Sequence, residues 1–115
     1  MATTTESPSL APGYVLGVVV GQAKAQSNDE WNAAVEKVWP EFIAILESNP
    51  GYKGAYAAWN PDKPGEVSII GIWQSMEHRL AYEAKSAPQI RELFNALISN
   101  PQRYKVVVSR AAAIV

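Results

Sequence analysis

The chain has 115 residues, of which 48% are hydrophobic and 18% are charged, so it fits one compact domain with its own core. Ten basic and eleven acidic residues leave a net charge of -1, and neither sign forms a run, which argues against a nucleic-acid-binding protein. There is no cysteine, which excludes disulfides, thiol catalysis and cysteine metal sites.

The first residues and the length of the apolar runs indicate where in the cell the protein is expected. No run of about 18 apolar residues occurs in the sequence, so we expect no membrane span. Residues 1–13 are polar and lack the basic and apolar regions of a secretion signal. We expect them to be a flexible leader, followed by a single domain over residues 14–115 in a cytoplasmic protein.

The first half of this domain predicts a strand and a long helix. Residues 14–23 are rich in valine and too short for a free-standing helix, and Gly17 and Gly21 would thin one face of this strand. Ser27 and Glu30 then have capping-box spacing. The apolar stripe of the helix contains Trp31, Val35, Val38, Trp39, Phe42, Ile45 and Leu46. Pro40 should kink this helix or split it near Trp39.

The middle of the chain predicts a hairpin. Residues 49–51, Asn-Pro-Gly, end the helix, and residues 52–60 place aromatic side chains at two-residue spacing, as a strand does. The proline-rich segment 61–65 is a turn, after which residues 66–74 form the second arm.

Two further helices and a strand complete the domain. Ser75 can cap a helix on which Met76, Leu80 and Ala84 share an apolar face, whereas His78 and Tyr82 lie on the more polar side. The next helix starts at residues 86–89, because Pro88 is tolerated only near a helix start, and it ends at Asn100 and Pro101. Its apolar stripe is Ile90, Leu93, Phe94 and Leu97. Residues 104–115 form the last strand.

This order of elements predicts an α+β fold, a ferredoxin-like βαββαβ sandwich whose antiparallel sheet carries helices on one face. Valine, isoleucine and alanine occupy both alternating sets of strand positions, so the other face would expose an apolar patch to water. We therefore expect two copies to pair through their sheets in a homodimer, as a dimeric α+β barrel with its helices outside.

Several common sites are missing from the sequence. One histidine, no cysteine and scattered acids make neither a closed zinc site nor an iron facial triad. No G-x-G-x-x-G, P-loop or nucleophile elbow is present. If the protein is an enzyme, we expect it to work without a metal or an organic cofactor.

A family resemblance lies in residues 50–77. The residues that carry it form a "PGY.G" strand start and a "W.S.E" strand-to-helix junction: Pro50, Gly51, Tyr52, Gly54, Trp73, Ser75 and Glu77. With these motifs the chain from Tyr14 to Val115 resembles the antibiotic biosynthesis monooxygenase (ABM) family of dimeric α+β barrels. That family includes cofactor-independent oxygenases of aromatic polyketides, haem-degrading enzymes, decarboxylases, cyclases and members of unknown activity, so the resemblance specifies the fold better than the reaction.

The resemblance implies a ligand cleft inside each subunit, between the helices and the helix-facing side of the sheet. On one strand Val67, Ile69, Gly71 and Trp73 share a face, and on the preceding strand Tyr52, Gly54, Tyr56, Ala58 and Asn60 share a face. Alternation alone leaves open which of these faces lines the cleft.

Three residues are candidates for catalysis. Trp73 could stack on a planar ligand or donate its indole hydrogen, or it could be a core residue at a strand end. His78 is the only side chain with an unperturbed pKa near neutrality, although it could equally lie at the surface or the cleft mouth. Tyr82 supplies a hydroxyl group.

Four residues are candidates for substrate binding. Trp39 adjoins the expected kink, where a pocket could open. Tyr56 and Asn60 offer a hydroxyl and an amide that would orient a polyphenol. Arg91, like Arg110, could hold an enolate or a carboxylate with its fork of donors, or be a solvated surface charge.

The function implied is that of a small cofactor-independent enzyme of specialised metabolism, an ABM-type monooxygenase that acts on an aromatic or polyketide-like substrate. The same cleft could serve a cyclase, a dehydratase or a decarboxylase. A third alternative is a non-catalytic dimer that binds a ligand or haem, with His78 as its only histidine ligand.

Overall fold

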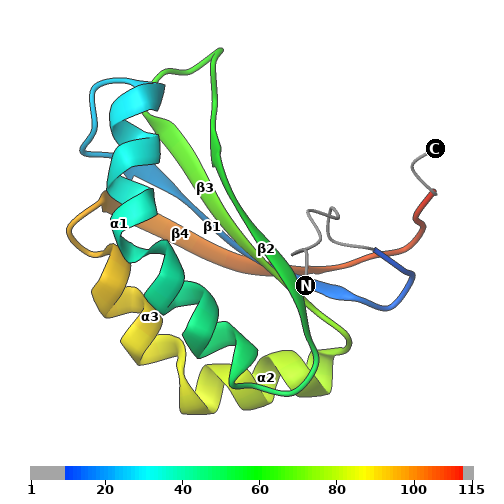
Figure 1. The fold of residues 1–115 in the computed structure, drawn as a ribbon. Coiled ribbons are helices and arrows are strands. Elements are labelled where there is room, and N and C mark those ends of the chain that lie inside the picture. Colours follow the sequence, from blue (N-terminus) through cyan, green and yellow to red (C-terminus); the bar gives the residue numbers. More distant parts are fainter. Residues whose placement is uncertain (1–9, 113–115) are drawn as a thin grey trace, which may run out of the picture.

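A computed structural model describes residues 10–112 of the chain (Figure 1). Its elements are β1 (Val15–Ala23), α1 (Asn28–Glu47), β2 (Tyr52–Trp59), β3 (Glu66–Trp73), α2 (Met76–Lys85), α3 (Ala87–Phe94) and β4 (Ile98–Val107). Most of the expected leader and residues 113–115 of the expected last strand lie outside the described residues. Residues 12 and 13 form a turn before β1, where the backbone nitrogen of Gly13 donates to the carbonyl of Val108 over 2.8 Å.

The four strands form one antiparallel sheet in the order β2-β3-β1-β4. The helices lie on one side of it (Figure 1). This is the ferredoxin-like α+β arrangement that the order of elements predicts. No helix of the described residues is long and apolar enough to cross a membrane.

Helix α1 begins as its sequence predicts. The side chain of Ser27 accepts a hydrogen bond from the backbone nitrogen of Glu30 over 3.2 Å, and the Glu30 carboxylate accepts one from the backbone of Gln26 over 2.9 Å. Pro40 does not split the helix, which is continuous from Asn28 to Glu47. Its axis changes direction near the middle instead (Figure 1), in agreement with a proline kink.

The boundary between α3 and β4 differs from the prediction. The helix ends at Phe94, and β4 begins at Ile98, so Asn100 and Pro101 lie inside the strand rather than at a helix end. They form a bulge, because the register of β4 against β1 shifts between Val20 and Gln22. Proline is tolerated here because β4 is an edge strand, where an amide that faces solvent has no ladder partner to lose. The strand then ends at Val107, before the predicted end.

Helix α2 is rotated relative to the prediction. Tyr82 is its buried residue, with 4% of its surface exposed, whereas Met76 and Leu80 of the apolar face are exposed. The reason is tertiary: the Tyr82 ring stacks on Trp73 of β3, with ring centroids 4.6 Å apart. This contact between two aromatic rings in the core outweighs the tendency of the helix to bury its apolar face.

A second bulge changes the faces of β2. The register between β2 and β3 shifts between Tyr52 and Gly54, so simple alternation fails. The residues of β2 that pack against the helix-side core are Tyr52, Ala55, Ala57 and Trp59. Tyr56 pairs with Ile70 on the opposite face. On β3 the face of Val67, Ile69, Gly71 and Trp73 is the one turned to the helices, where all four are buried.

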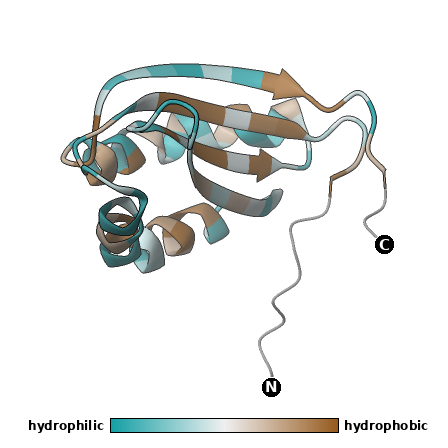
Figure 2. Cartoon of the chain, turned by 90° about the horizontal axis from the view of Figure 1, so that it is seen from above, coloured by the Kyte–Doolittle hydropathy of each residue, from teal (hydrophilic) through white to brown (hydrophobic). Residues whose placement is uncertain are grey.

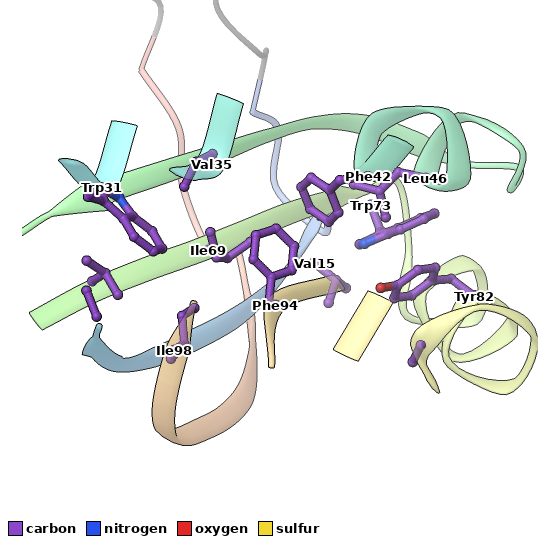
Figure 3. Close-up of a cluster of buried hydrophobic side chains, with 13 residues drawn as sticks. Val15, Trp31, Val35, Phe42, Leu46, Ile69, Trp73, Tyr82, Phe94 and Ile98 are labelled. Atoms are coloured by element: carbon purple, nitrogen blue, oxygen red, sulfur yellow. The ribbon is translucent and has the colours of Figure 1, made fainter. Parts of the chain in front are cut away.

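The core lies between the sheet and the helices (Figure 3). Trp31, Phe42 and Leu46 of α1 pack there with Phe94 of α3, and the Phe42 and Phe94 rings meet edge to face at 5.1 Å. Hydrophobic residues also run along the strands of the sheet (Figure 2). On the face without helices, Tyr56, Tyr104 and Val106 are exposed.

Candidate functional site

A hollow opens between the helix side of the sheet and the pair α2 and α3. Its lining residues are Val19, Ile69, Arg79, Tyr82, Ala87, Ile90, Arg91, Phe94, Asn95, Ile98, Pro101 and Arg103. The hollow has an empty volume of about 550 Å³, which includes its open mouth. The location agrees with the cleft that the family resemblance implies.

Tyr82 forms part of the wall of this hollow, and Trp73 supports it from behind. Their rings stack at 4.6 Å with an interplanar angle of 26°, and Trp73 is fully buried behind Tyr82. Figure 3 shows the indole nitrogen and the phenolic oxygen at the same end of the stack, the end nearer Phe94. The indole nitrogen has no hydrogen-bond partner among the described residues. This nitrogen is itself buried and Trp73 is not part of the lining, so Trp73 contributes to the hollow through the Tyr82 ring on which it stacks.

Arg79 approaches the hollow from α2. Its guanidinium group lies 4.9 Å from the centre of the Tyr82 ring and donates a hydrogen bond to the Glu83 carboxylate over 2.8 Å. Lys105 of β4 also donates to Glu83, over 3.0 Å. Burial pushes the pKa of Glu83 up, but the hydrogen bonds from Arg79 and Lys105 outweigh it and hold the pKa below its usual value of 4.5. Glu83 is therefore a weak base that orients Arg79.

The polar side chains that line the hollow are hydrogen-bond donors, and none of them is a neutral base that could accept a proton at pH 7. Its polar lining consists of Arg79, Arg91, Arg103, Tyr82 and Asn95, with no acid and no histidine. Burial raises the pKa of the Tyr82 phenol above its usual value of 10.0, although Arg79 and Arg91 act in the opposite direction. Tyr82 thus stays protonated at neutral pH and acts as a donor. The arrangement suits the stabilisation of a negative charge on a bound molecule.

His78 lies outside this lining. Its Nδ1 atom is 2.7 Å from the Oγ of Ser75, the N-cap of α2, and a methyl group on Gly51 would collide with its ring. The histidine therefore joins the start of α2 to the turn before β2. No group of three or more histidines and acids able to hold a metal ion occurs in the described part of the chain.

The remaining predicted site residues are dispersed. Asn60 holds the β2–β3 hairpin, where its amide donates to Glu66 over 3.0 Å. Trp39 packs on Phe42 with ring centroids 5.2 Å apart, beside the core. Tyr56 lies on the open face of the sheet, and Arg110 follows β4 at the surface. Of the seven predicted residues, only Tyr82 and Arg91 line the hollow, and Trp73 is stacked behind Tyr82.

Two of the three arginines that line the hollow, Arg79 and Arg103, escaped the sequence analysis. Arg79 could have been found from its i, i+4 spacing to Glu83 together with Gly17, which leaves space for a side chain over β1. No sequence pattern pointed to Arg103, because the last strand is predicted to begin only at Tyr104. The bulge at Asn100 and Pro101 is what places Arg103 opposite Val19 on the helix side.

No protein-family model matches the sequence, and no curated protein matches it at a significant level. Solved structures do match the fold. SnoaB, a cofactor-independent oxygenase from Streptomyces nogalater, superimposes with a TM-score of 0.65 at 15% identity, over 86% of this chain and 96% of SnoaB. A protein from Nitrosomonas europaea, provisionally assigned as an antibiotic biosynthesis monooxygenase, gives 0.60 at 9% identity, over 87% and 94%. One from Chloroflexus aurantiacus with the same provisional assignment gives 0.55 at 18% identity, over 89% and 99%.

These identities are low, whereas each superposition covers nearly the whole of the matched chain. The comparison therefore concerns the fold, and the chemistry has to be argued from the hollow itself. The chain has the fold of the antibiotic biosynthesis monooxygenases, as the resemblance in its sequence predicts.

Proposed function

We propose that the protein is a small oxygenase that acts on a flat phenolic or polyketide-like molecule in the hollow, without a metal or an organic cofactor. The observation that carries this proposal is the stack of Trp73 on Tyr82 at a hollow whose polar groups are donors. SnoaB, which shares the fold, is a cofactor-independent oxygenase.

The chemistry requires only that an anion of the substrate be stabilised. A CH₂ group conjugated with a carbonyl, as in the keto form of an anthrone, loses one proton to water at the open mouth, since arginine and tyrosine donors lower the free energy of the resulting enolate. The enolate gives one electron to dioxygen, and the carbon radical combines with superoxide to a peroxide at that carbon, which takes up a proton to become a CH–OOH group. Loss of water converts the CH₂ group to a carbonyl, so one oxygen atom enters the product and the other leaves as water.

Within this mechanism the named side chains have distinct roles. Tyr82 donates from its protonated phenol to the developing oxyanion, and Trp73, stacked behind it, holds the Tyr82 ring in place. Arg91 adds positive charge near Tyr82. The apolar side chains of Ile69, Phe94 and Ile98 contact the rings of the substrate.

A cofactor-free decarboxylase or cyclase is the second candidate. The same observation favours it, because donors without a base also stabilise the enolate that loss of carbon dioxide or an aldol step produces. Haem binding has less support, since His78 lies outside the hollow with its Nδ1 next to Ser75.

The test is turnover of a panel of anthrones and aromatic polyketides with and without oxygen. We expect oxygen uptake and a product that gains one atom from labelled dioxygen, whereas product formed equally under nitrogen would favour the decarboxylase or cyclase. Tyr82→Phe should lower kcat/KM about tenfold or more, because it removes the donor and keeps the ring. Trp73→Phe should also lower it, because the smaller ring supports Tyr82 less well. Arg110→Gln, outside the hollow, is the control. Unchanged turnover in both ring variants would refute the assignment.

We also propose that the protein is a homodimer. Tyr56, Ile70, Val18 and Tyr104 pair in register, so they form one apolar row across all four strands of the open face. Tyr104 is 50% exposed and the neighbouring Val106 is 42% exposed. A second copy would remove this surface from water by face-to-face packing of the sheets.

A further inference from the structure

We infer that the ligand of the hollow is an aromatic acid, whose carboxylate binds between Arg91 and Arg103. This inference rests on the proposed function, since it specifies the substrate class of the same hollow. Arg91 comes from α3 and Arg103 from β4, so the two side chains approach the hollow from different walls.

Within residues 10–112, no acidic side chain compensates the charges of these two arginines. No acidic side chain of the described residues forms an ion pair with Arg91 or Arg103, whereas Arg79 is paired with Glu83. The chain as a whole has a net charge of -1, yet the lining carries three arginines and no acid. Such a concentration of one sign in a concave, partly apolar site attracts anions.

The lining of the hollow is apolar next to the two arginines. Ile90 and Phe94 belong to it together with Arg91 and Arg103, so the rings of a ligand would lie against Ile90 and Phe94 while its carboxylate reaches the arginines. A guanidinium group presents parallel donors that match the two oxygens of a carboxylate, a match that a single enolate oxygen does not offer.

The test compares two flat ligands that differ only in charge. Anthraquinone-2-carboxylate and anthraquinone-2-carboxamide have the same rings and are already oxidised, so binding to the full-length protein is measured without turnover by calorimetry or by quenching of tryptophan fluorescence. We expect the acid to bind at least about tenfold more tightly than the amide at low salt. Its advantage should shrink as salt rises from 50 to 500 mM, because screening weakens the ionic contacts.

Matched variants locate the effect. Arg91→Gln and Arg103→Gln should each reduce the preference for the acid, and the double variant should abolish it while binding of the amide remains. Arg110→Gln removes the same charge outside the hollow and should leave the preference unchanged. If a variant fails to fold by circular dichroism, the wild-type preference and its salt dependence still decide the matter.

Three results would overturn the inference: equal binding of acid and amide, a preference that survives the double variant, or binding of neither ligand. Its failure is separable from failure of the proposed function. If acid and amide bind equally while a neutral anthrone is turned over with oxygen, the oxygenase proposal holds and only the inference of an acidic ligand is refuted. Absence of both binding and turnover would remove both proposals.

Discussion

The guanidinium group of Arg79 on α2 lies directly over Gly17 of β1. A methyl group built on Gly17 would collide with the Nη1 and Cζ atoms of Arg79, so the glycine creates the space that the arginine occupies. Arg79 in turn contacts the Tyr82 ring and holds Glu83. The absence of a side chain at Gly17 thus determines where the positive charge of Arg79 lies at the hollow.

Gly17→Ala should displace Arg79 while the fold is kept. The collision is with the end of a flexible side chain, so we expect the free energy of unfolding to fall by about 1 kcal/mol or less. Turnover or ligand binding should weaken about threefold to tenfold, because the orientation of a charge at the site changes. The check is a double-mutant cycle with Arg79→Ala. If Gly17→Ala weakens binding as much in the Arg79→Ala background as in the wild type, the effect does not pass through Arg79.

His78→Ala should affect stability more than function. The change removes the contact between Nδ1 and the Ser75 hydroxyl and the packing of the ring on Gly51, so we expect a loss of about 1 kcal/mol in chemical denaturation. Binding of anthraquinone ligands in the hollow should change less than about twofold, because His78 is not part of the lining. A loss of turnover with unchanged stability would show that the histidine acts in the reaction.

The sequence predicts those parts of the site that depend on local signals. Trp73 at a strand end and Ser75 as a helix cap are local, and they place α2 beside the hollow as expected. The rotation of α2 could not be predicted from its own sequence, whose three apolar residues favour burying the opposite face. The stack of Tyr82 on Trp73 decides the orientation instead, and it leaves those three residues exposed. The position of Arg103 depends on a bulge, and a shift of one residue exchanges the two faces of a strand.

Glu83→Gln should destabilise the protein at neutral pH but not in acid. Because hydrogen bonds from Arg79 and Lys105 lower the folded-state pKa of Glu83, its stabilising effect is present above the unfolded value near 4.5 and is lost as the pH falls through the folded value. We expect the variant to be about 1 kcal/mol less stable at pH 7. The difference should shrink as the pH falls below the unfolded value near 4.5 and through the lower folded value.

Urea denaturation of wild type and variant across this pH range measures the effect. Glu36→Gln removes an exposed acid from α1 and serves as the control. A difference between wild type and Glu83→Gln that is the same at pH 3 and pH 7 would show that the ionised carboxylate is not what stabilises the fold.

Tyr104→Glu should convert the proposed dimer to a monomer. Tyr104 lies on the open face in the apolar row that crosses the sheet, so a carboxylate there would have to be buried against the second copy without a partner. Sedimentation at micromolar concentration should give the mass of two chains for the wild type and of one for the variant. Leu80→Glu places the same charge on an exposed apolar residue of α2, away from the sheet, and should remain dimeric. A wild type with the mass of one chain would refute the dimer, and a dimeric Tyr104→Glu would place its interface elsewhere than the open face.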